Sequence, residues 1–419
     1  MNYKEFFKKE IIKTKASGFY REFVPIIRER KTFPFSFIAH EASGDDQFNS
    51  ETKIWCTNDY LNMSQNEVVI EKMIDVIRKV GASSGGTRNI SGTTPYHIEL
   101  ENKIAQFHSR EKALVFNSAY LANQTSLWTL CKKIPNIQIF SDELNHASLI
   151  QGIKNAGADC HIFAHNNTIQ LEKLLSQFDK STPKLIVFES LYSMDGTKAK
   201  IGNYVKLAKK YNAMTYLDEV HAVGLYGEKG KGVASECGFS DQIDIINGTL
   251  AKAVGQIGGY ITGDLDIIEF IRNQAPGFIF TTSIMPAVAA AAKTSLNIIE
   301  NANDLRQDIF KKANYIKSKL SEKNISYIDS ESHIIPVLIG SADRSKEISK
   351  KLMEDYNIYV QPIFYPTVPK DSSRLRITVT PKHTYQDIDY LIFAINETIN
   401  SRETQRDSFS VKVKSPSYA

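Results

Sequence analysis

The sequence contains few cysteines and no apolar stretch long enough to cross a bilayer. Four cysteines occur among the 419 residues, at positions 56, 131, 160 and 237, and none belongs to a CxxC pair. This usage argues against a disulfide framework or a zinc module and fits a reducing compartment. The apolar run at 285–292 ends at Lys293, so it is too short to span a membrane. The nine histidines include no HExxH pattern, and we expect no metal site.

An excess of one charge is also absent. The chain has 51 basic and 47 acidic residues, a net charge of +4, which is too mild to indicate binding to nucleic acid or to an anionic membrane. Residues 1–10 are polar and charged, unlike a secretory signal, and they lack the Arg- and Ser-rich pattern of a transit peptide. We therefore expect a cytoplasmic protein that binds neither nucleic acid nor membranes.

Segments with strand and helix patterns alternate through the middle of the chain. Short apolar runs predict four buried strands of a mostly parallel sheet, at 113–116, 185–188, 214–217 and 243–246. Apolar residues at helical spacing predict helices that cover the sheet, at 96–108, 171–178 and 204–211. This alternation is typical of the α/β class, with a large sheet domain.

The pattern changes after about residue 300, where a smaller α+β domain is expected. Its predicted elements are helices at 303–323, 346–356 and 385–398, strands at 334–339 and 374–378, and an extended piece at 358–362. The predicted division of the chain is an N-terminal helical arm at 1–50, a large domain at 51–300, a C-terminal domain at 301–400 and a polar tail at 401–419.

Polar residues follow the predicted strands at their carboxyl ends, which is where open α/β sheets bind ligands. Asp218 directly follows the strand at 214–217, and Lys252 follows the strand at 243–246. A lysine and an acid on neighbouring strand ends suit a pyridine-ring cofactor, because the amine can condense with an aldehyde while the carboxylate keeps the ring nitrogen protonated. Spacing alone leaves an alternative equally open, in which Asp218 caps a turn and Lys252 is a surface lysine.

Two glycine-rich stretches, at 85–89 and 224–232, allow a backbone to approach a ligand closely. Neither matches the dinucleotide fingerprint or the P-loop, and taken singly each is an ordinary loop. Residues 117–120 lie between a predicted strand and the following segment. A helix that began there could hold a phosphate with its free N–H groups.

Longer motifs carry a resemblance to a known family. They are SGGTRNISGT (84–93), SDELNHAS (141–148), FESLYSMDG (188–196), YLDEVHAVGLYG (216–227), DIINGTLAKA (244–253), APGFIFTTS (275–283) and YPTVP (365–369). With these motifs the chain resembles the α-oxoamine synthases, and within them the branch that forms 5-aminolevulinate, from about Gly18 to the last predicted helix. The resemblance implies a fold-type I transferase that depends on pyridoxal 5'-phosphate and acts as a homodimer, with its sites at the subunit interface.

The resemblance also implies roles for particular residues. Lys252 matches the lysine that forms a Schiff base with pyridoxal phosphate, Asp218 matches the partner of the ring nitrogen, and His146 matches the imidazole stacked on the ring. The other implied cofactor-binding residues contact the ring hydroxyl or the phosphate, Thr281 and Thr282 from the second subunit: Ser118, Ala119, Tyr120, Ser193, His221, Thr249, Thr281 and Thr282.

Matches to substrate-binding positions point to an amino acid and a dicarboxylic acyl group. Arg376 is similar to the arginine that holds the amino-acid carboxylate beside Asn58, a task that suits a bidentate guanidinium. Thr87 matches the position associated with selectivity for glycine, and Ser141 matches a further substrate contact. The implied pocket for the succinyl carboxylate consists of Arg21, Asn89, Ile90 and Thr367.

The implied reaction condenses glycine with succinyl-CoA and releases CoA and CO2, giving 5-aminolevulinate, the heme precursor. In it, the Lys252 amine removes a proton from the glycine Cα as a general base.

Cys160 departs from the pattern, because a basic residue that helps with the acyl-CoA is usual there, although Lys154 is a nearby cation. Besides the implied reaction, two other functions stay open. One is a sister synthase with another amino acid or acyl thioester, such as a carrier-bound one in a secondary-metabolite pathway. The other is a non-catalytic sensor, which the short N-terminal arm without a helix-turn-helix argues against.

Overall fold

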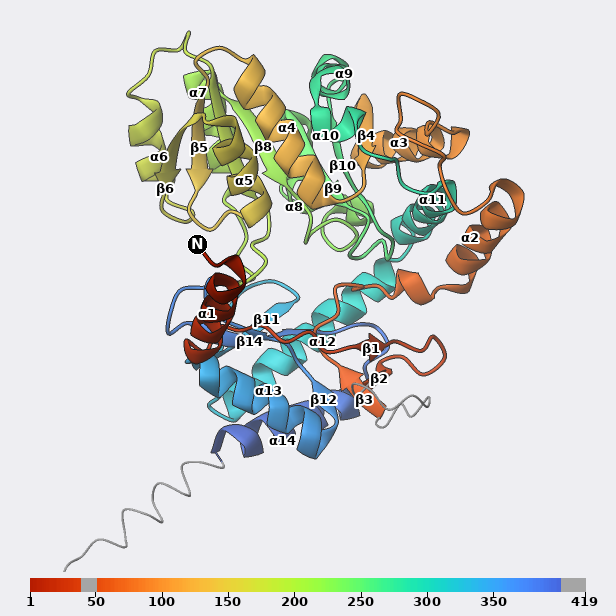
Figure 1. Cartoon of the computed structure of the whole chain (residues 1–419), viewed down its shortest axis with the longest axis vertical. Helices are drawn as coiled ribbons and strands as arrows, with labels where there is room; N and C mark the ends of the chain where they lie inside the picture. The colour runs from red at the N-terminus through yellow and green to blue at the C-terminus, as the bar shows by residue number, and fades with distance from the viewer. Residues whose placement is uncertain (39–50, 401–419) are drawn as a thin grey trace, which may run out of the picture. The chain divides into compact units, whose positions relative to one another are not determined.

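The computed structural model describes residues 1–38 and 51–400, which divide into two compact units (Figure 1). The first unit combines the two ends of the described chain, up to Thr57 and from Ile309 onward, and the second unit consists of residues 58–308. The N-terminal segment, which was predicted as a separate arm, therefore groups with the C-terminal part. The predicted polar tail at 401–419, and residues 39–50 of the predicted arm, lie outside the described residues.

A seven-stranded sheet forms the centre of the second unit, in the order β4-β10-β9-β8-β7-β5-β6. Its strands are β4 (Lys112–Phe116), β5 (Gln138–Asp142), β6 (Asp159–Phe163), β7 (Lys184–Glu189), β8 (Met214–Asp218), β9 (Ile245–Thr249) and β10 (Gly259–Gly263). Strands β6, β5, β7, β8 and β9 pair in parallel, and β10 runs antiparallel between β9 and β4. The predicted mostly parallel sheet is confirmed. The sequence had not predicted β10, because glycines begin and end its five residues and resemble a turn.

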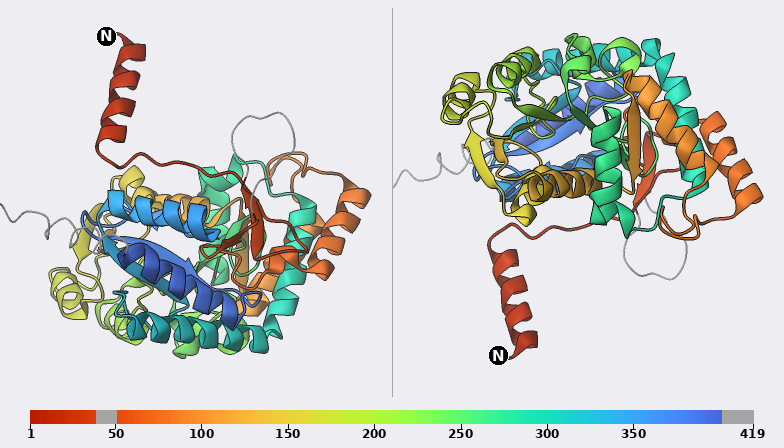
Figure 2. Two further views of the ribbon diagram at one scale, coloured as in Figure 1. Left: turned by 90° about the horizontal axis from the view of Figure 1, so that it is seen from below. Right: turned by 90° about the horizontal axis from the view of Figure 1, so that it is seen from above.

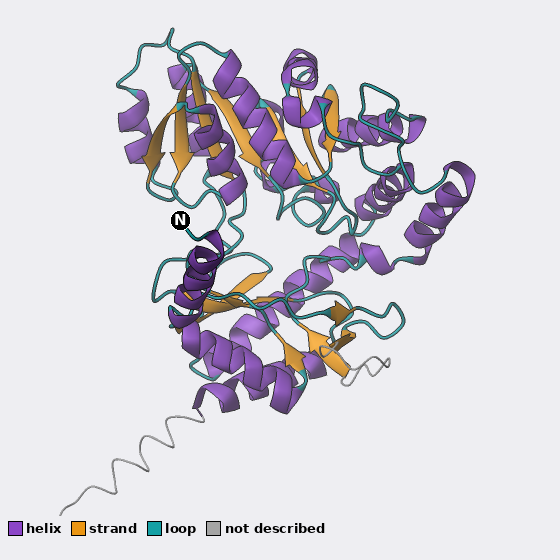
Figure 3. Cartoon of the chain, in the orientation of Figure 1, coloured by secondary structure: helices purple, strands orange, loops and turns teal. Residues whose placement is uncertain are grey.

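Helices cover both faces of this sheet (Figure 3). One face packs against α4 (Ala119–Lys133), α5 (Ala147–Ala156), α9 (Leu265–Gln274) and α10 (Pro276–Ile279). The other face packs against α3 (Pro95–His108), α6 (Thr168–Leu175) and α7 (Ile201–Tyr211). On this second face the ring of Tyr204 lies 4.4 Å from that of Phe188. The remaining helices of the unit are α2 (Glu67–Val80), α8 (Val233–Glu236) and α11 (Pro286–Glu300), with short 3-10 turns at 63–65, 228–230 and 240–242.

The first unit contains two small sheets with covering helices. One sheet has the order β1 (Ile26–Ile27), β2 (Phe35–Ile38), β3 (Glu51–Ile54) and β12 (Ile358–Tyr359), and the other has β11 (Ile334–Gly340), β14 (Ser373–Thr378) and β13 (Pro362–Ile363). The helices are α1 (Tyr3–Ala16), α13 (Ala342–Tyr356) and α14 (Tyr385–Asn400), while α12 (Asn303–Glu322) contains the boundary between the units. The predicted C-terminal helices and strands are confirmed.

The N-terminal segment is only partly helical. All side chains of α1 are exposed, and Figure 2 shows α1 as the helix at the N-terminus of the chain. After α1 the chain forms β1 and β2, where the sequence predicted a helical arm. The reason is that the side chains of β2 alternate between buried and half-buried positions, as expected for a strand with one face against a core. Among the described residues, no helix combines the length and the apolar character that crossing a bilayer requires.

From the packing of the large sheet we predict how a core substitution changes the free energy of unfolding. Leu185 of β7 is fully buried among the helices α4 and α5 and neighbouring strands. We expect Leu185→Ala to lower the free energy of unfolding by about 2–5 kcal/mol, because the substitution removes apolar burial and leaves a cavity. Urea-induced unfolding measures the change. The control is Ile169→Ala at a side chain that is 82% exposed, where we expect a change within about 0.5 kcal/mol. Equal losses in both variants would contradict the packing.

Candidate active site

Carboxyl ends of parallel strands bring three acidic side chains to one edge of the large sheet. Asp142 ends β5, Glu189 ends β7 and Asp218 ends β8. Glu189 and Asp218 are direct partners in the register of the two strands. Lys252 follows the end of β9, which is the next strand beyond β8. This edge is where open α/β sheets bind ligands, so the topology brings together the lysine and the acid that the sequence singled out.

Asp218 is buried, and both of its oxygens accept hydrogen bonds. The side-chain amide of Asn123 on α4 donates to Oδ2 at 2.6 Å, and the backbone N–H of Val220 donates to Oδ1 at 2.9 Å. This is the hydrogen-bonding pattern of an ionised carboxylate, and it compensates for the removal of the charge from water. The carboxylate can therefore pair with a cationic N–H group of a ligand.

His146 begins α5, with its ring near Asp218 and Lys252. Its Nδ1 accepts the backbone N–H of Ser148 at 3.2 Å and lies 2.8 Å from the Ser148 hydroxyl. Burial lowers the pKa of His146 below its usual value; the negative charge of Asp218 partly opposes this effect and the positive charge of Lys252 adds to it. A neutral imidazole at this position can pack against a flat ring without placing a second cation beside a pyridinium.

Glu189 is a buried acid to which the sequence assigned no role. Its Oε1 accepts the backbone N–H of His146 at 2.6 Å, so it holds the start of α5 against the end of β7. Burial raises the pKa of this carboxyl well above its usual value, and the neighbouring charge of Asp218 raises it further. Its place directly after a fully buried strand was the available sequence signal, as it was for Asp218.

Lys252 lies in a tight turn between β9 and β10. The Thr249 hydroxyl donates to the carbonyl of Gly258 at 3.2 Å and accepts the backbone N–H of Ala251 at 3.1 Å. The backbone N–H of Gly255 also donates to the carbonyl of Lys252 at 2.8 Å. These bonds hold the Lys252 backbone in one conformation, so the half-buried side chain starts from a fixed point.

The N-terminus of α4 packs closely against β10. Ser118 caps the helix, because its hydroxyl accepts the backbone N–H of Leu121 at 3.0 Å. A Cβ atom at Gly259 would lie 2.1 Å from the backbone nitrogen of Ala119, so only glycine fits at this contact. Ala119 and Tyr120 form the first turn, where free N–H groups can bind a phosphate.

Two loops predicted to contact substrate and phosphate meet in this unit. Thr87 and Thr282 form an isolated β-bridge, and the Asn117 side chain donates to the carbonyl of Thr282 at 2.9 Å. Arg88 makes two hydrogen bonds with Glu101 of α3, at 2.7 and 2.9 Å, in a buried ion pair. No role had been predicted for Arg88. The ion pair holds the loop that carries the predicted substrate residues Asn89 and Ile90 against α3.

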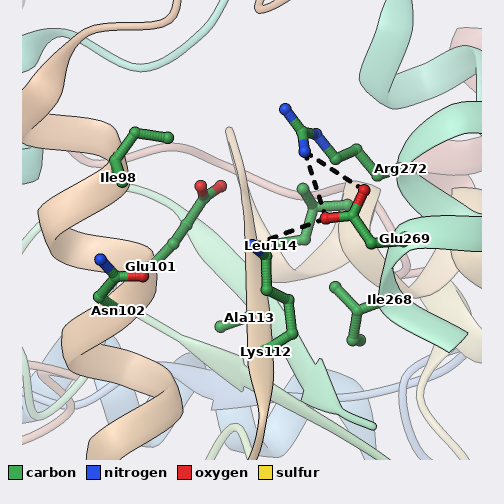
Figure 4. A pocket seen from close by; sticks show the side chains of 9 residues that line it. All are labelled: Ile98, Glu101, Asn102, Lys112, Ala113, Leu114, Ile268, Glu269 and Arg272. Atoms are coloured by element: carbon green, nitrogen blue, oxygen red, sulfur yellow. Dashed lines mark hydrogen bonds and ion pairs between the residues drawn. The ribbon is translucent and has the colours of Figure 1, made fainter. Parts of the chain in front are cut away.

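A small cavity lies beside this ion pair, between α3, β4 and α9 (Figure 4). Glu101, Lys112, Glu269 and Arg272 line it together with apolar residues. Its volume of about 30 Å³ is close to that of one water molecule. The cavity is therefore too small to hold a substrate or cofactor.

Other predicted residues of the second unit lie near the same strand ends. Nδ1 of His221 is 2.8 Å from the hydroxyl of Tyr60, and that hydroxyl also lies 3.3 Å from Oδ1 of Asn58. Ser193 is buried in the turn after β7. Ser141 is a buried residue of β5 whose hydroxyl accepts the Asn145 amide at 2.9 Å. Thr281 lies in the segment that precedes Thr282 and α11.

The predicted residues Arg21, Thr367 and Arg376 belong to the first unit. The Arg21 guanidinium donates to the Thr367 hydroxyl at 2.9 Å, and both line a groove of about 800 Å³. Arg376 is a buried residue of β14. A guanidinium that reaches a hydroxyl at the wall of a groove is suited to bind a carboxylate there.

Cys160 lies away from the strand ends that carry the acidic residues. It is the second residue of the edge strand β6, paired with Ile139 of β5. Phe163, at the carboxyl end of β6, lies three positions further along the strand, which corresponds to about 10 Å. Within this unit, a cysteine in place of a basic residue at position 160 does not alter the acidic residues at the strand ends.

Glu219 links three loops at the same edge. Its carboxyl accepts hydrogen bonds from the hydroxyl of Ser190 and from the backbone N–H groups of Val233 and Ala234. Gly232 approaches so closely that a Cβ there would lie 2.7 Å from the Glu219 carboxyl carbon. Burial raises the pKa of Glu219 to about 7, while these hydrogen bonds partly lower it.

Among the described residues, no group of three or more His, Cys, Asp or Glu side chains could hold a metal ion.

Comparisons with known proteins agree with this arrangement. Residues 52–395 match the family model described as aminotransferase class I and II. A 5-aminolevulinate synthase from Rhizobium meliloti (strain 1021) is 46% identical over 396 residues, which cover 94% of this chain and 97% of that protein. A 5-aminolevulinate synthase from Rickettsia prowazekii (strain Madrid E) is 46% identical over 393 residues, which cover 94% of this chain and 93% of that protein.

The fold is also similar to that of a solved structure. A serine palmitoyltransferase variant from S. paucimobilis, with a bound PLP–myriocin aldimine, superposes with a TM-score of 0.86 at 27% identity. The match covers 95% of this chain and 98% of that one. The similarity extends to both units, because it includes nearly the whole chain.

From the raised pKa of Glu219 we predict how the free energy of unfolding changes with pH. The folded value of about 7 lies above the ordinary 4.5, so between these values the native state keeps a proton that the unfolded chain has released. The stability from this group is therefore complete below pH 4.5 and lost as the pH rises through about 7. Relative to Glu219→Gln, wild type should lose about 2–3 kcal/mol between pH 5 and pH 8.

Urea unfolding of both proteins at several pH values measures this loss. Glu71→Gln at an exposed position of α2 is the control, and its stability should follow that of wild type across the same range. A constant difference between wild type and Glu219→Gln would show that Glu219 does not change its charge between the native and the unfolded state in this range.

Proposed function

Because the chain belongs to the 5-aminolevulinate synthase family, we propose that it condenses glycine with succinyl-CoA and uses pyridoxal phosphate as its cofactor. The products are 5-aminolevulinate, CoA and CO2, so the protein supplies the heme precursor. The observation that carries the proposal is the placement of Lys252 and Asp218 after the ends of neighbouring strands, where both Asp218 oxygens act as acceptors. A cofactor with an aldehyde and a basic ring nitrogen needs a primary amine and a carboxylate in this arrangement.

The residues present fit pyridoxal phosphate at each of its three functional groups. Asp218 suits the protonated ring nitrogen, and Lys252 suits the aldehyde. The first turn of α4 at Ser118, held against Gly259, suits the phosphate. His146 caps α5 beside these groups and burial lowers its pKa, so it suits the face of the ring. When bound, the cofactor supplies an electron sink for the pair left by removal of a Cα proton.

The side chains of this chain perform the remaining tasks. Lys252 removes the Cα proton of glycine as a general base, a role that typically accelerates a reaction about 10²–10⁴-fold. Arg376 holds the glycine carboxylate with its bidentate guanidinium, together with Asn58. Thr87 limits the space beside Cα, so amino acids with larger side chains are excluded. The remaining cofactor contacts in the proposal are Tyr120, Ser193, His221, Thr249 and Ala119.

Binding of the acyl donor depends on a charged hydrogen bond in the first unit. Arg21 and Thr367 are hydrogen-bonded to each other and line the same groove. The proposal assigns the distal carboxylate of the succinyl group to Arg21, with Asn89, Ile90 and Ser141 as further substrate contacts. An uncharged acyl chain has no carboxylate that could pair with the Arg21 guanidinium. The presence of Arg21 therefore favours succinyl-CoA over the uncharged donors of a sister synthase.

A homodimer in the cytoplasm completes the proposal, with Thr281 and Thr282 reaching the phosphate of the second subunit's site. Exposed apolar side chains support a covering subunit: Ile90 and Phe280 are both 79% exposed. They belong to the two loops that the bridge between Thr87 and Thr282 joins. Apolar side chains exposed together in this way are typical of protein interfaces.

The first test of the proposal is the removal of the Lys252 amine. We expect Lys252→Ala to form no detectable 5-aminolevulinate, at least about 10³-fold below wild type, because it lacks both the amine that binds the aldehyde and the base. Product formation from glycine and succinyl-CoA measures the loss, and absorbance measures binding of pyridoxal phosphate. The exposed Lys173→Ala on α6 is the control and should keep wild-type activity. Residual turnover in Lys252→Ala near the wild-type rate would rule out its role.

The second test separates succinyl-CoA from uncharged acyl donors. We expect Arg21→Leu to lower kcat/KM for succinyl-CoA about 10- to 100-fold, because a charge-assisted hydrogen bond is lost. The values for acetyl-CoA and butyryl-CoA should change little. Arg28→Leu is the matched control, since Arg28 contacts the Thr57 hydroxyl in the same unit. An unchanged ratio between the donors would remove Arg21 from the acyl site, and a wild-type preference for uncharged donors would favour the sister synthase.

A further inference from the structure

Hydrogen bonds join Asp218 to His146 through the side chains of Asn123 and Ser148, and Tyr216 bonds to the same Asn123 amide; these three residues have no assigned role. We propose that Asn123, Ser148 and Tyr216 are positioning residues that fix which atoms of Asp218 and His146 carry a proton. These three side chains are called the relay. The inference rests on the proposed function, because Asp218 and His146 are the groups that would face the ring of pyridoxal phosphate.

The relay connects three elements of the second unit. The amide nitrogen of Asn123 on α4 donates to Oδ2 of Asp218 at 2.6 Å and to the hydroxyl of Ser148 at 3.0 Å. The Tyr216 hydroxyl donates to Oδ1 of Asn123 at 3.0 Å. The Ser148 hydroxyl lies 2.8 Å from Nδ1 of His146. Asn123, Ser148 and Tyr216 are each no more than 1% exposed, so water does not compete for the bonds that Asn123 makes with Asp218, Ser148 and Tyr216.

The contacts of Asn123 allow only one orientation of its amide. Its oxygen accepts from Tyr216, and its nitrogen uses both hydrogens, one toward Asp218 and one toward Ser148. If the amide were turned over, its oxygen would lie at the same 2.6 Å from an oxygen of Asp218. Two acceptors at that distance repel each other, so the orientation is fixed.

This orientation determines the proton positions at the other end of the relay. The Ser148 hydroxyl accepts a hydrogen from Asn123, so its own hydrogen is available for Nδ1 of His146. The backbone N–H of Ser148 also points at Nδ1, at 3.2 Å. Nδ1 is therefore an acceptor, and the neutral ring carries its hydrogen on Nε2. Burial, which lowers the pKa of His146, acts in the same direction.

At Asp218 the relay has a different effect. Asn123 supplies one donor to Oδ2, and the backbone N–H of Val220 supplies one to Oδ1. Each oxygen keeps a further lone pair, which can accept a hydrogen bond from a cationic N–H group of a ligand. A single amide thus keeps Asp218 an acceptor and His146 neutral, so one cation, the ring nitrogen, is favoured between them.

The first experiment follows the His146 ring by NMR of histidine-labelled protein, with and without pyridoxal phosphate. The nitrogen shifts of the ring report the tautomer, and the His146 signal is identified by its loss in His146→Asn. In wild type we expect the hydrogen on Nε2. Ser148→Ala should raise the titration midpoint of His146 by about 0.5–1 pH unit, because the hydroxyl that stabilises the neutral ring is gone.

Ser295→Ala is the matched control for Ser148→Ala. Ser295 is equally buried in the same unit, and its hydroxyl donates to the carbonyl of Val254 at 2.7 Å. Both variants lose one buried hydrogen bond, so their thermal stabilities should fall by similar amounts. A His146 signal that is unchanged in Ser148→Ala would show that the relay only holds the helices, and the proposal would be abandoned.

The second experiment measures the cofactor end of the relay. We expect Asn123→Asp to raise the dissociation constant of pyridoxal phosphate at least about 10-fold and to shift the pH at which its bound absorbance changes, because two acids then face each other. Tyr216→Phe removes only the group that orients the amide, and a smaller rise of about 3-fold is expected. Tyr204→Phe, which removes an equally buried hydroxyl near Asp142, should match wild type.

The two experiments separate failure of the relay from failure of the proposed function. Wild-type protein that binds no pyridoxal phosphate would contradict the proposed function, while the His146 measurements without cofactor would still test the relay. Normal binding with wild-type absorbance in both Asn123→Asp and Tyr216→Phe would instead refute the role of the relay at Asp218.

Discussion

The burial of a negative charge at the end of β8 is the constraint on which the rest of the site depends. Asp218 is only 4% exposed, and an unpaired carboxylate at such a place would cost several kcal/mol. Donors from Asn123 and from the backbone of Val220 reduce this cost. They require α4 to lie close to the sheet and the chain to turn sharply after β8. A ligand cation completes the compensation, so the site is built to be most favourable when occupied.

Of the two neighbouring acids, Asp142 is compensated by donors as Asp218 is, and Glu189 differs. Asp142 accepts backbone N–H groups from Leu144 and Asn166 at 3.0 Å each. Glu189 keeps one donor, the backbone of His146, and its pKa is raised well above the usual value by burial and by Asp218. Of the three acids on adjacent strand ends, two are matched by several donors, and the third accepts one backbone donor and has a raised pKa.

The sequence predicted the features that depend on local patterns. Buried strands such as 185–188 were recognisable from continuous apolar runs. Asp218 and Lys252 were singled out because they follow such strands, but only the longer motifs favoured a cofactor role over a turn cap and a surface lysine. Features that depend on distant residues were not predictable. Asn123 and Asp218 are 95 positions apart, and nothing in the local sequence of α4 indicates that its amide faces that acid. Strand β10 was missed because its glycines, which close contacts require, resemble a turn.

The first unit combines two segments that are far apart in the sequence, and this affects the order in which the parts of the chain can fold during synthesis. Strand β3 near the N-terminus pairs in parallel with β12, about 300 residues later in the chain. A ribosome must therefore release almost the entire chain before this sheet can close, whereas residues 58–308 can collapse earlier as one continuous segment. Strands β1, β2 and β3 can pair with one another early, but β3 spends that interval without β12 on its other edge. An early-made strand thus presents an open edge until the last part of the chain arrives.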